Sequence, residues 1–164
     1  MLMRNTLFVA LITMILLCNM VLANSAFEIK GNVPKSIEVT APDNPNKWTF
    51  GLMDNEYRVG NIHITTNSDS WAISLSANPD RMTSGTYSIL NPVYAKSLFN
   101  RQYITNNYVI ELSSSPKELL KCSGDSEGEN KNMDLPLNIS QFVVIGDVPA
   151  QNYQTVITVT GMAS

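Results

Sequence analysis

The stretch of residues 57–78, YRVGNIHITTNSDSWAISLSAN, decides the fold that we expect for this chain. Apolar and polar side chains alternate along both of its halves, which is the pattern of strands with one buried and one exposed face. The apolar members of this alternation are Ile62, Ile64, Trp71, Ile73 and Leu75. Between the halves, Asn67-Ser68-Asp69-Ser70 is a cluster of residues that favour turns. The stretch therefore predicts an antiparallel hairpin at the centre of a sheet, with Trp71 as the largest core side chain.

The same alternation continues on both sides of this hairpin. It predicts further strands, separated by Gly, Pro, Asn and Asp, at 27–31, 37–40, 47–52, 93–99, 103–112, 135–145 and 152–160. Trp48, Phe50 and Leu52 are expected on one face of their strand, and residues 53–56 are expected to turn into the hairpin. The segment 116–120 fits a helical turn and a short strand equally well. About nine or ten short strands without helical periodicity predict an all-β fold, an antiparallel β-sandwich of immunoglobulin-like architecture.

The N-terminus has the layout of a secretion signal, which we expect as an apolar helix at 1–23. Arg4 precedes a long apolar run that ends in the small-residue site Val21-Leu22-Ala23. Cleavage between Ala23 and Asn24 would leave residues 24–164 as a single secreted domain. The alternative is a retained membrane anchor, because a run of about 18 apolar residues can also span a bilayer.

Composition excludes two classes of protein. The chain of 164 residues carries 11 basic and 14 acidic residues and has a formal net charge of −3, without runs of Lys and Arg. A general nucleic-acid-binding function is excluded, because neutralising phosphates requires clustered basic side chains. A disulfide scaffold is excluded as well, because Cys122 is the one cysteine that remains after cleavage.

No set of residues predicts catalysis or metal binding. His63 is the only histidine, and no Cys or Asp lies near it in the sequence. Cys122 is expected to be a free or buried thiol, with an interchain disulfide as the alternative. The acidic segment with Asp125, Glu127 and Glu129 lacks the glycine and glutamate of an EF-hand, which predicts a solvated loop. We therefore expect a protein that is not an enzyme and that holds no cofactor.

Two features are candidate sites for carbohydrate. Asn138-Ile139-Ser140 is a glycosylation sequon, and Asn138 could carry a glycan if it faces outward on its strand. Five aromatic residues could line a sugar-binding face, although such residues in strands more often form core or cross-strand pairs. They are Trp48, Tyr57, Trp71, Tyr103 and Tyr108. An exposed aromatic strip would favour this function, and buried tryptophans would count against it.

Three segments resemble small secreted β-sandwich proteins of archaeal cell surfaces, especially those of methanogens. They are the Trp48 strand ahead of a Gly-containing hairpin, the turn and strand at 68–75, and the ending at 147–160. The layout is also similar to WxL-type and pilin-like surface domains of bacteria, although Trp71-Ala72-Ile73 differs from the Trp-x-Leu motif. The resemblance implies a structural role at the cell surface or envelope, with assembly of subunits and no catalytic residue.

The expected function is that of a secreted surface or envelope protein that assembles with itself or with other envelope proteins. A carbohydrate- or ligand-binding module is the alternative. Membrane contact is expected only through an uncleaved signal segment. Phe27 and Ile29, which follow the cleavage site, are the candidate assembly residues. Their segment can pair within its own sheet or insert into the sheet of a neighbouring subunit.

Overall fold

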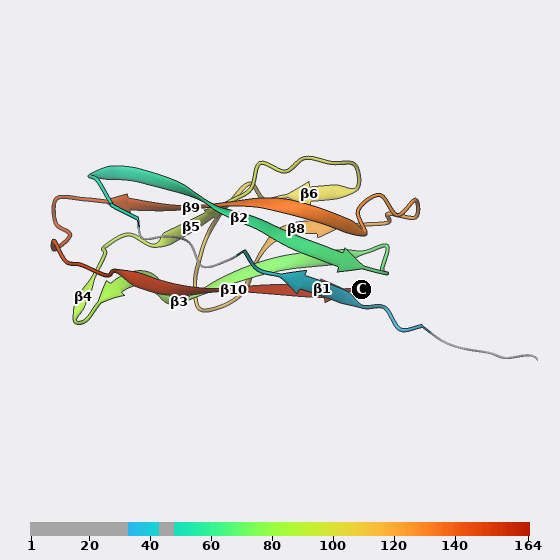
Figure 1. The fold of residues 1–164 in the computed structure, drawn as a ribbon, viewed down its shortest axis with the longest axis horizontal. Helices are drawn as coiled ribbons and strands as arrows, with labels where there is room; N and C mark the ends of the chain where they lie inside the picture. Colours follow the sequence, from blue (N-terminus) through green and yellow to red (C-terminus); the bar gives the residue numbers. More distant parts are fainter. Residues whose placement is uncertain (1–32, 43–47) are drawn as a thin grey trace, which may run out of the picture. The chain divides into compact units, whose positions relative to one another are not determined.

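Ten β-strands and no helix lie in the part of the chain that the computed structural model describes, residues 33–42 and 48–164. The strands form two antiparallel sheets (Figure 1). The order in the first sheet is β1 (Ile37–Thr40), β2 (Met53–Thr66), β9 (Asn132–Val143), β5 (Val93–Lys96) and β7 (Val109–Glu111). The order in the second is β10 (Gln154–Ala163), β3 (Trp71–Ser84), β8 (Lys117–Cys122) and β6 (Ile104–Asn106), with β4 (Tyr87–Ser88) paired to β3. The expected all-β class with antiparallel sheets is confirmed.

The expected central hairpin is wrong in one respect, because its two strands do not pair with each other. β2 lies between β1 and β9 in the first sheet, whereas β3 lies between β10 and β8 in the second. The turn at Asn67 to Ser70 therefore crosses from one sheet to the other. Asn67 secures this crossing, since its side-chain amide donates to the Pro34 carbonyl at 2.9 Å and its Oδ1 accepts from Ser36 N–H at 2.7 Å. The alternation of apolar and polar residues determines which face of each strand points toward the core. The same face points inward whether the two strands pair as a hairpin or lie in opposite sheets, so the pattern does not distinguish these arrangements.

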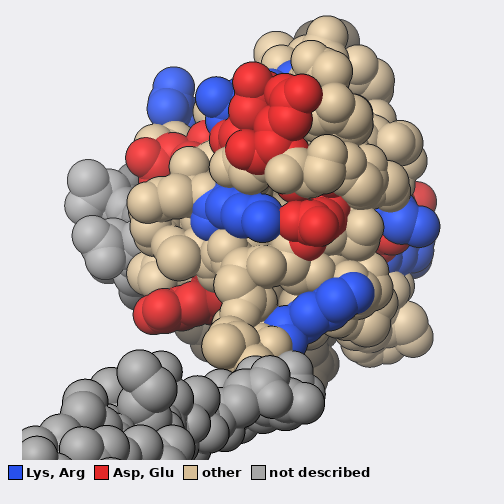
Figure 2. Space-filling model, turned by 90° about the vertical axis from the view of Figure 1, so that its right-hand side faces the viewer, with Lys and Arg blue, Asp and Glu red and all other residues tan. Residues whose placement is uncertain are grey.

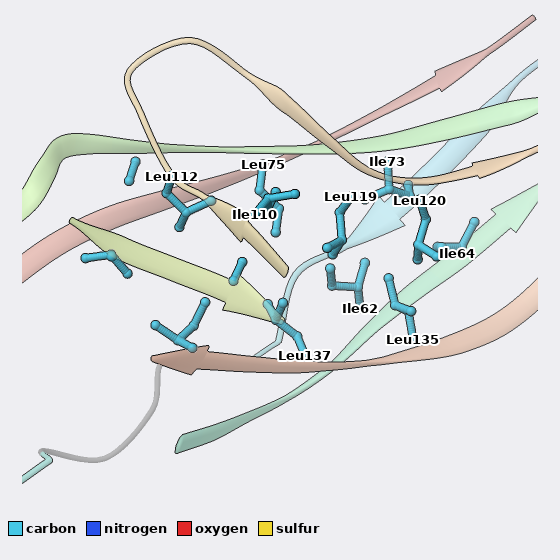
Figure 3. Close-up of a cluster of buried hydrophobic side chains, with 14 of the residues drawn as sticks. Ile62, Ile64, Ile73, Leu75, Ile110, Leu112, Leu119, Leu120, Leu135 and Leu137 are labelled. Atoms are coloured by element: carbon cyan, nitrogen blue, oxygen red, sulfur yellow. The ribbon is translucent and has the colours of Figure 1, made fainter. Parts of the chain in front are cut away.

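The faces of both strands are as expected, and they build the core between the sheets. Apolar side chains from β2 and β9 meet those from β3 and β8 (Figure 3). The fully buried members on these four strands include Ile62, Ile64, Leu135, Leu137, Ile73, Leu75, Leu119 and Leu120. Trp71 is 1% exposed and is the largest buried side chain, as expected. Each such side chain contributes about 1.5–3 kcal/mol through burial, so the interface between the sheets holds the fold together.

The expected strand at 47–52 is not formed in its described part, and β2 begins at Met53 rather than after residue 56. Met53 has a φ of 85°, which interrupts an extended chain. The Asn55 side chain then replaces ladder hydrogen bonds, accepting from Gly51 N–H and donating to the Gly51 carbonyl, both at 2.8 Å. Leu52 is 62% exposed, so it does not share a buried face with Trp48.

Among the described residues, the strand expected at 37–40 has the predicted limits, and the remaining expected strands are present with shifted limits. The segment 116–120, for which helix and strand were open, belongs to strand β8. The strand expected at 103–112 is divided into β6 and β7, because Tyr108 between them has a φ of 54°. Tyr108 is consequently 49% exposed, whereas Ile110 and Leu112 are buried. The signal helix at 1–23 and the strand at 27–31 lie outside the described residues.

Candidate functional site

The sheets have four edges, and one of them differs from the others in length. β1 has 4 residues, and β6 and β7 have 3 each. β10 has 10 residues, and within the described residues it pairs only with β3. The outer edge of β10 therefore leaves its backbone N–H and C=O groups free of any ladder partner in that part of the chain. We call this the β10 edge.

The β10 edge lacks the features that usually protect a sheet from pairing with another chain. Short length, charged side chains and proline are the common protections. The sequence of β10, QTVITVTGMA, contains neither a charged residue nor a proline. A register shift between Gln154 and Val156 is its single irregularity. On its outward face Val156 is 68% exposed and Met162 is 63% exposed. The edge is thus suited to backbone pairing with a further strand.

β1 closes the gap between the sheets along only part of β10. A Cβ atom at Gly161 would overlap the Cγ2 methyl of Val39 and would lie 3.2 Å from Cδ1 of Ile37. Glycine is therefore required where the side chains of β1 cross β10. β1 ends at Thr40, and a groove begins beyond it.

This groove, which we call the β10 groove, runs between the sheets beside the first part of β10. Its walls include Val59 of β2, Leu137 and Ile139 of β9, and Ile157 and Val159 of β10. It holds about 1440 Å³, which exceeds the roughly 300–1,000 Å³ of typical small-molecule sites. The size and the open form of the groove fit an extended polypeptide better than a small ligand.

Trp48 and Phe50 line the groove and belong to an aromatic cluster with Tyr57. Trp48 stacks on Tyr57 with ring centroids 4.6 Å apart and planes 5° apart. Phe50 meets both rings edge-on at 6.3 and 6.2 Å. Tyr57 also donates its hydroxyl to the Thr49 carbonyl. These contacts attach the segment before β2 to the inner face of that strand.

The five aromatic residues considered for sugar binding do not form one surface. Trp71 lies in the core, and Trp48 and Tyr57 stack on each other. Tyr108 is exposed on the turn between β6 and β7. The separation of these side chains counts against a flat carbohydrate-binding strip.

His63 has a partner that the sequence did not reveal. Its Nδ1 lies 2.9 Å from Oδ1 of Asp134, and its Nε2 lies 3.3 Å from Oγ1 of Thr65. The order carboxylate, imidazole, hydroxyl is that of a nucleophilic triad. However, all three residues are exposed on the outer face of the first sheet, and Asp134 is 62% exposed in its side chain. A catalytic site needs a cleft that excludes water, so this arrangement is a surface cross-strand pair.

The acidic segment is more ordered than a solvated loop. Asp125 is fully buried, and its carboxylate accepts the backbone N–H of Asn130 at 2.6 Å and of Glu129 at 3.2 Å. Glu127 and Glu129 remain exposed. Within residues 33–42 and 48–164, no three His, Cys, Asp or Glu side chains come together as a metal site.

Cys122 is buried at the end of β8, which agrees with the expected buried thiol. Burial raises the pKa of this thiol, and the nearby carboxylates of Asp125 and Asp69 raise it further. A buried thiol with a raised pKa is a poor nucleophile.

Asn138 lies on β9 opposite Arg58, in the position of the sequon. It is half-buried, and its Nδ2 donates to Oε1 of Glu56 at 2.7 Å. Ser140, the third residue of the sequon, is 3% exposed. A glycan on Nδ2 would leave this atom a single N–H, the one that the bond to Glu56 requires. Ala23, Asn24, Phe27 and Ile29 lie outside the described residues.

The end of the molecule that carries the turn between β2 and β3 has charged side chains of both signs. Basic and acidic side chains are interspersed on it (Figure 2). Lys131 and Asp69 form an ion pair there at 2.8 Å. Such a mixed surface favours solubility and has no field of a single sign.

No protein-family model matches the chain, and no curated protein matches it significantly. In the described part of the chain, no helix has the length and hydropathy needed to cross a membrane.

Proposed function

We propose that this protein is a secreted structural subunit of the cell surface or envelope, which assembles with copies of itself through strand pairing along the β10 edge. The observation that carries the proposal is the length of that edge combined with its lack of charge and proline. Each net backbone hydrogen bond contributes about 0.5–1.5 kcal/mol, so several ladder bonds together can hold a neighbouring subunit.

The strand order supports a finer assignment, an immunoglobulin-like sandwich in which the described residues leave one strand position unfilled. Immunoglobulin domains place strands A, B, E and D in one sheet and C, F and G in the other. β1, β2, β9 and β5 follow the first order, and β3 and β10 take the places of C and F. The position of strand G then lies along the β10 edge. β4, β6, β7 and β8 are additions to this plan.

The N-terminal sequence supports secretion, since a charged residue, an apolar run and a small-residue site follow each other as in signal peptides. The mature protein should then begin at Asn24. Mass spectrometry of cell-surface material tests this directly. Recovery of a mature chain that still contains Met1 to Ala23 would favour a membrane anchor instead.

The assembly proposal is tested with the mature chain, residues 24–164, by light scattering after gel filtration and by electron microscopy. The wild type is expected to form species larger than a monomer as its concentration rises. Thr158→Lys places a charge on the exposed face of β10 and should abolish these species. Thr105→Lys makes the same change on the short strand β6 and should leave assembly intact. A wild type that stays monomeric at every concentration would overturn the proposed function.

A further inference from the structure

We propose that the β10 groove binds the segment Phe27–Lys30 of a second copy of this chain, which pairs with β10 as an added strand. This inference rests on the proposed function and names both partners of the contact. In sequence the segment reads Phe27-Glu28-Ile29-Lys30, so its apolar and charged side chains alternate. An added strand of this pattern can direct Phe27 and Ile29 into the groove while Glu28 and Lys30 stay in water.

The groove offers what such a strand requires. The side chains of Ile157 and Val159 point into it from β10, and Val59 and Ile139 face them from the other sheet. An apolar side chain inserted there is removed from water on both sides, which stabilises the complex by about 25 cal/mol per Å² of apolar surface buried. The backbone of the incoming strand meets the N–H and C=O groups of the β10 edge, which have no ladder partner in residues 33–42 and 48–164. Affinity and side-chain selectivity thus come from neighbouring parts of one site.

The position of Pro34 favours a second copy over the segment's own molecule. Pro34 lies beside the turn between β2 and β3, where Asn67 binds its carbonyl. The C-terminus lies at the same end, since Lys35 Nζ donates to the Ser164 carbonyl at 2.7 Å. From Ser164 to Ile157 a strand advances by about 23 Å, at about 3.3 Å per residue. A segment that turned back into its own groove would have to cover this length and also pass β1.

The reach of the segment suits a neighbour. Residues 24–32, which precede Val33 after cleavage at Ala23, can extend over about 30 Å. That length covers the open part of β10, which lies before Gly161. The segment Phe27–Lys30 precedes Pro34 in the chain, and the β10 groove begins beyond the end of β1. The inserting segment and the groove that receives it are therefore different surfaces of the protein. Contacts of this head-to-tail kind do not close in pairs, so they build filaments.

The test uses two complementary variants of the mature chain. The donor variant, Phe27→Asp/Ile29→Asp, loses the apolar side chains of the inserting segment and keeps the groove. The groove variant, Ile157→Lys, places a charge in the groove and keeps the inserting segment. Each variant alone should be monomeric, and mixing them should give a one-to-one complex and nothing larger. Thr105→Lys is the control for the groove variant, because it places the same charge on the exposed face of the short strand β6. It keeps both the donor segment and the groove, so on its own it should assemble like the wild type, whereas Ile157→Lys on its own should not.

A synthetic peptide of residues 25–32 provides a second measurement that does not depend on the folding of Ile157→Lys. The labelled peptide should bind the donor variant saturably and should block assembly of the wild type, whereas a peptide with Asp at 27 and 29 should do neither. If the wild type assembles but the donor variant assembles equally well, or the peptide does not bind, the inference is overturned and the proposed function stands. If the wild type is monomeric and only the donor variant binds the peptide, the segment fills its own groove and the inference is also overturned.

Discussion

Gly161→Ala is expected to destabilise the domain, although alanine usually stabilises a strand relative to glycine. The added Cβ would overlap the Cγ2 methyl of Val39, so β1 would have to shift. Overpacking of this kind costs about 1–3 kcal/mol. Replacing glycine by alanine at a compatible site returns about 0.4–1 kcal/mol through the unfolded state. The free energy of unfolding should therefore fall by about 1–2 kcal/mol, since the first effect is the larger.

A double-mutant cycle with Val39→Ala tests the physical cause. Val39→Ala removes the overlapping methyl, and because Val39 is half-buried its loss should cost about 1 kcal/mol. In the double variant the two costs should not add, and the coupling energy should be at least about 0.5 kcal/mol. Urea unfolding followed by tryptophan fluorescence measures all four proteins, with the exposed neighbour Thr160→Ala as the control. Additive costs, or a Gly161→Ala variant as stable as the wild type, would show that β1 does not pack against β10 at this point.

Three further experiments test the core, the thiol and one ion pair. Trp71→Ala should lower the free energy of unfolding by about 3–5 kcal/mol, because a large buried aromatic leaves a cavity; a variant of normal stability in urea would show that Trp71 is not a core residue. Cys122 should react with a thiol reagent only when the protein is unfolded, since burial raises its pKa, and rapid labelling of the native protein would contradict its burial. Glu56→Gln should make the free energy of unfolding fall less steeply as the pH is lowered. Hydrogen bonds from Lys96 and Asn138 lower the pKa of Glu56, so its stabilising effect is complete above the ordinary value of 4.5 and is lost as pH falls through the lowered value. A variant with the acid dependence of the wild type would show that this group does not contribute.

The side-chain contacts that sequence reasoning missed are those whose partners are distant in the chain or are backbone groups of a folded turn. His63 and Asp134 are 71 residues apart and meet because β2 pairs with β9 in that register. Asp125 looked like one of several solvated acids, yet it is buried where its carboxylate accepts two backbone N–H groups. Neither pairing leaves a local pattern, because each depends on which strands become neighbours.

The candidate site was half predictable for the same reason. The alternating, β-branched sequence at 152–160 predicted a strand, and β10 is formed there. The sequence of that strand also shows directly that it contains no charged residue and no proline. That β10 lies at a sheet edge, with a groove beside it, depends on where β1 ends and on which strand pairs with β3.

Local sequence was sufficient for the class of the fold and for the inward faces of its main strands. Ile62, Ile64, Ile73 and Leu75 are buried as their alternation predicts, because a strand turns successive side chains to opposite sides whatever its neighbours are. Tertiary structure alone decided that β2 and β3 belong to different sheets and that β10, among the described strands, has a ladder partner on one side only. Alternation carries no information about partners, since backbone hydrogen bonds are the same for every strand. The choice among partners is made by the packing of distant side chains, of which the contact between Val39 and Gly161 is one example.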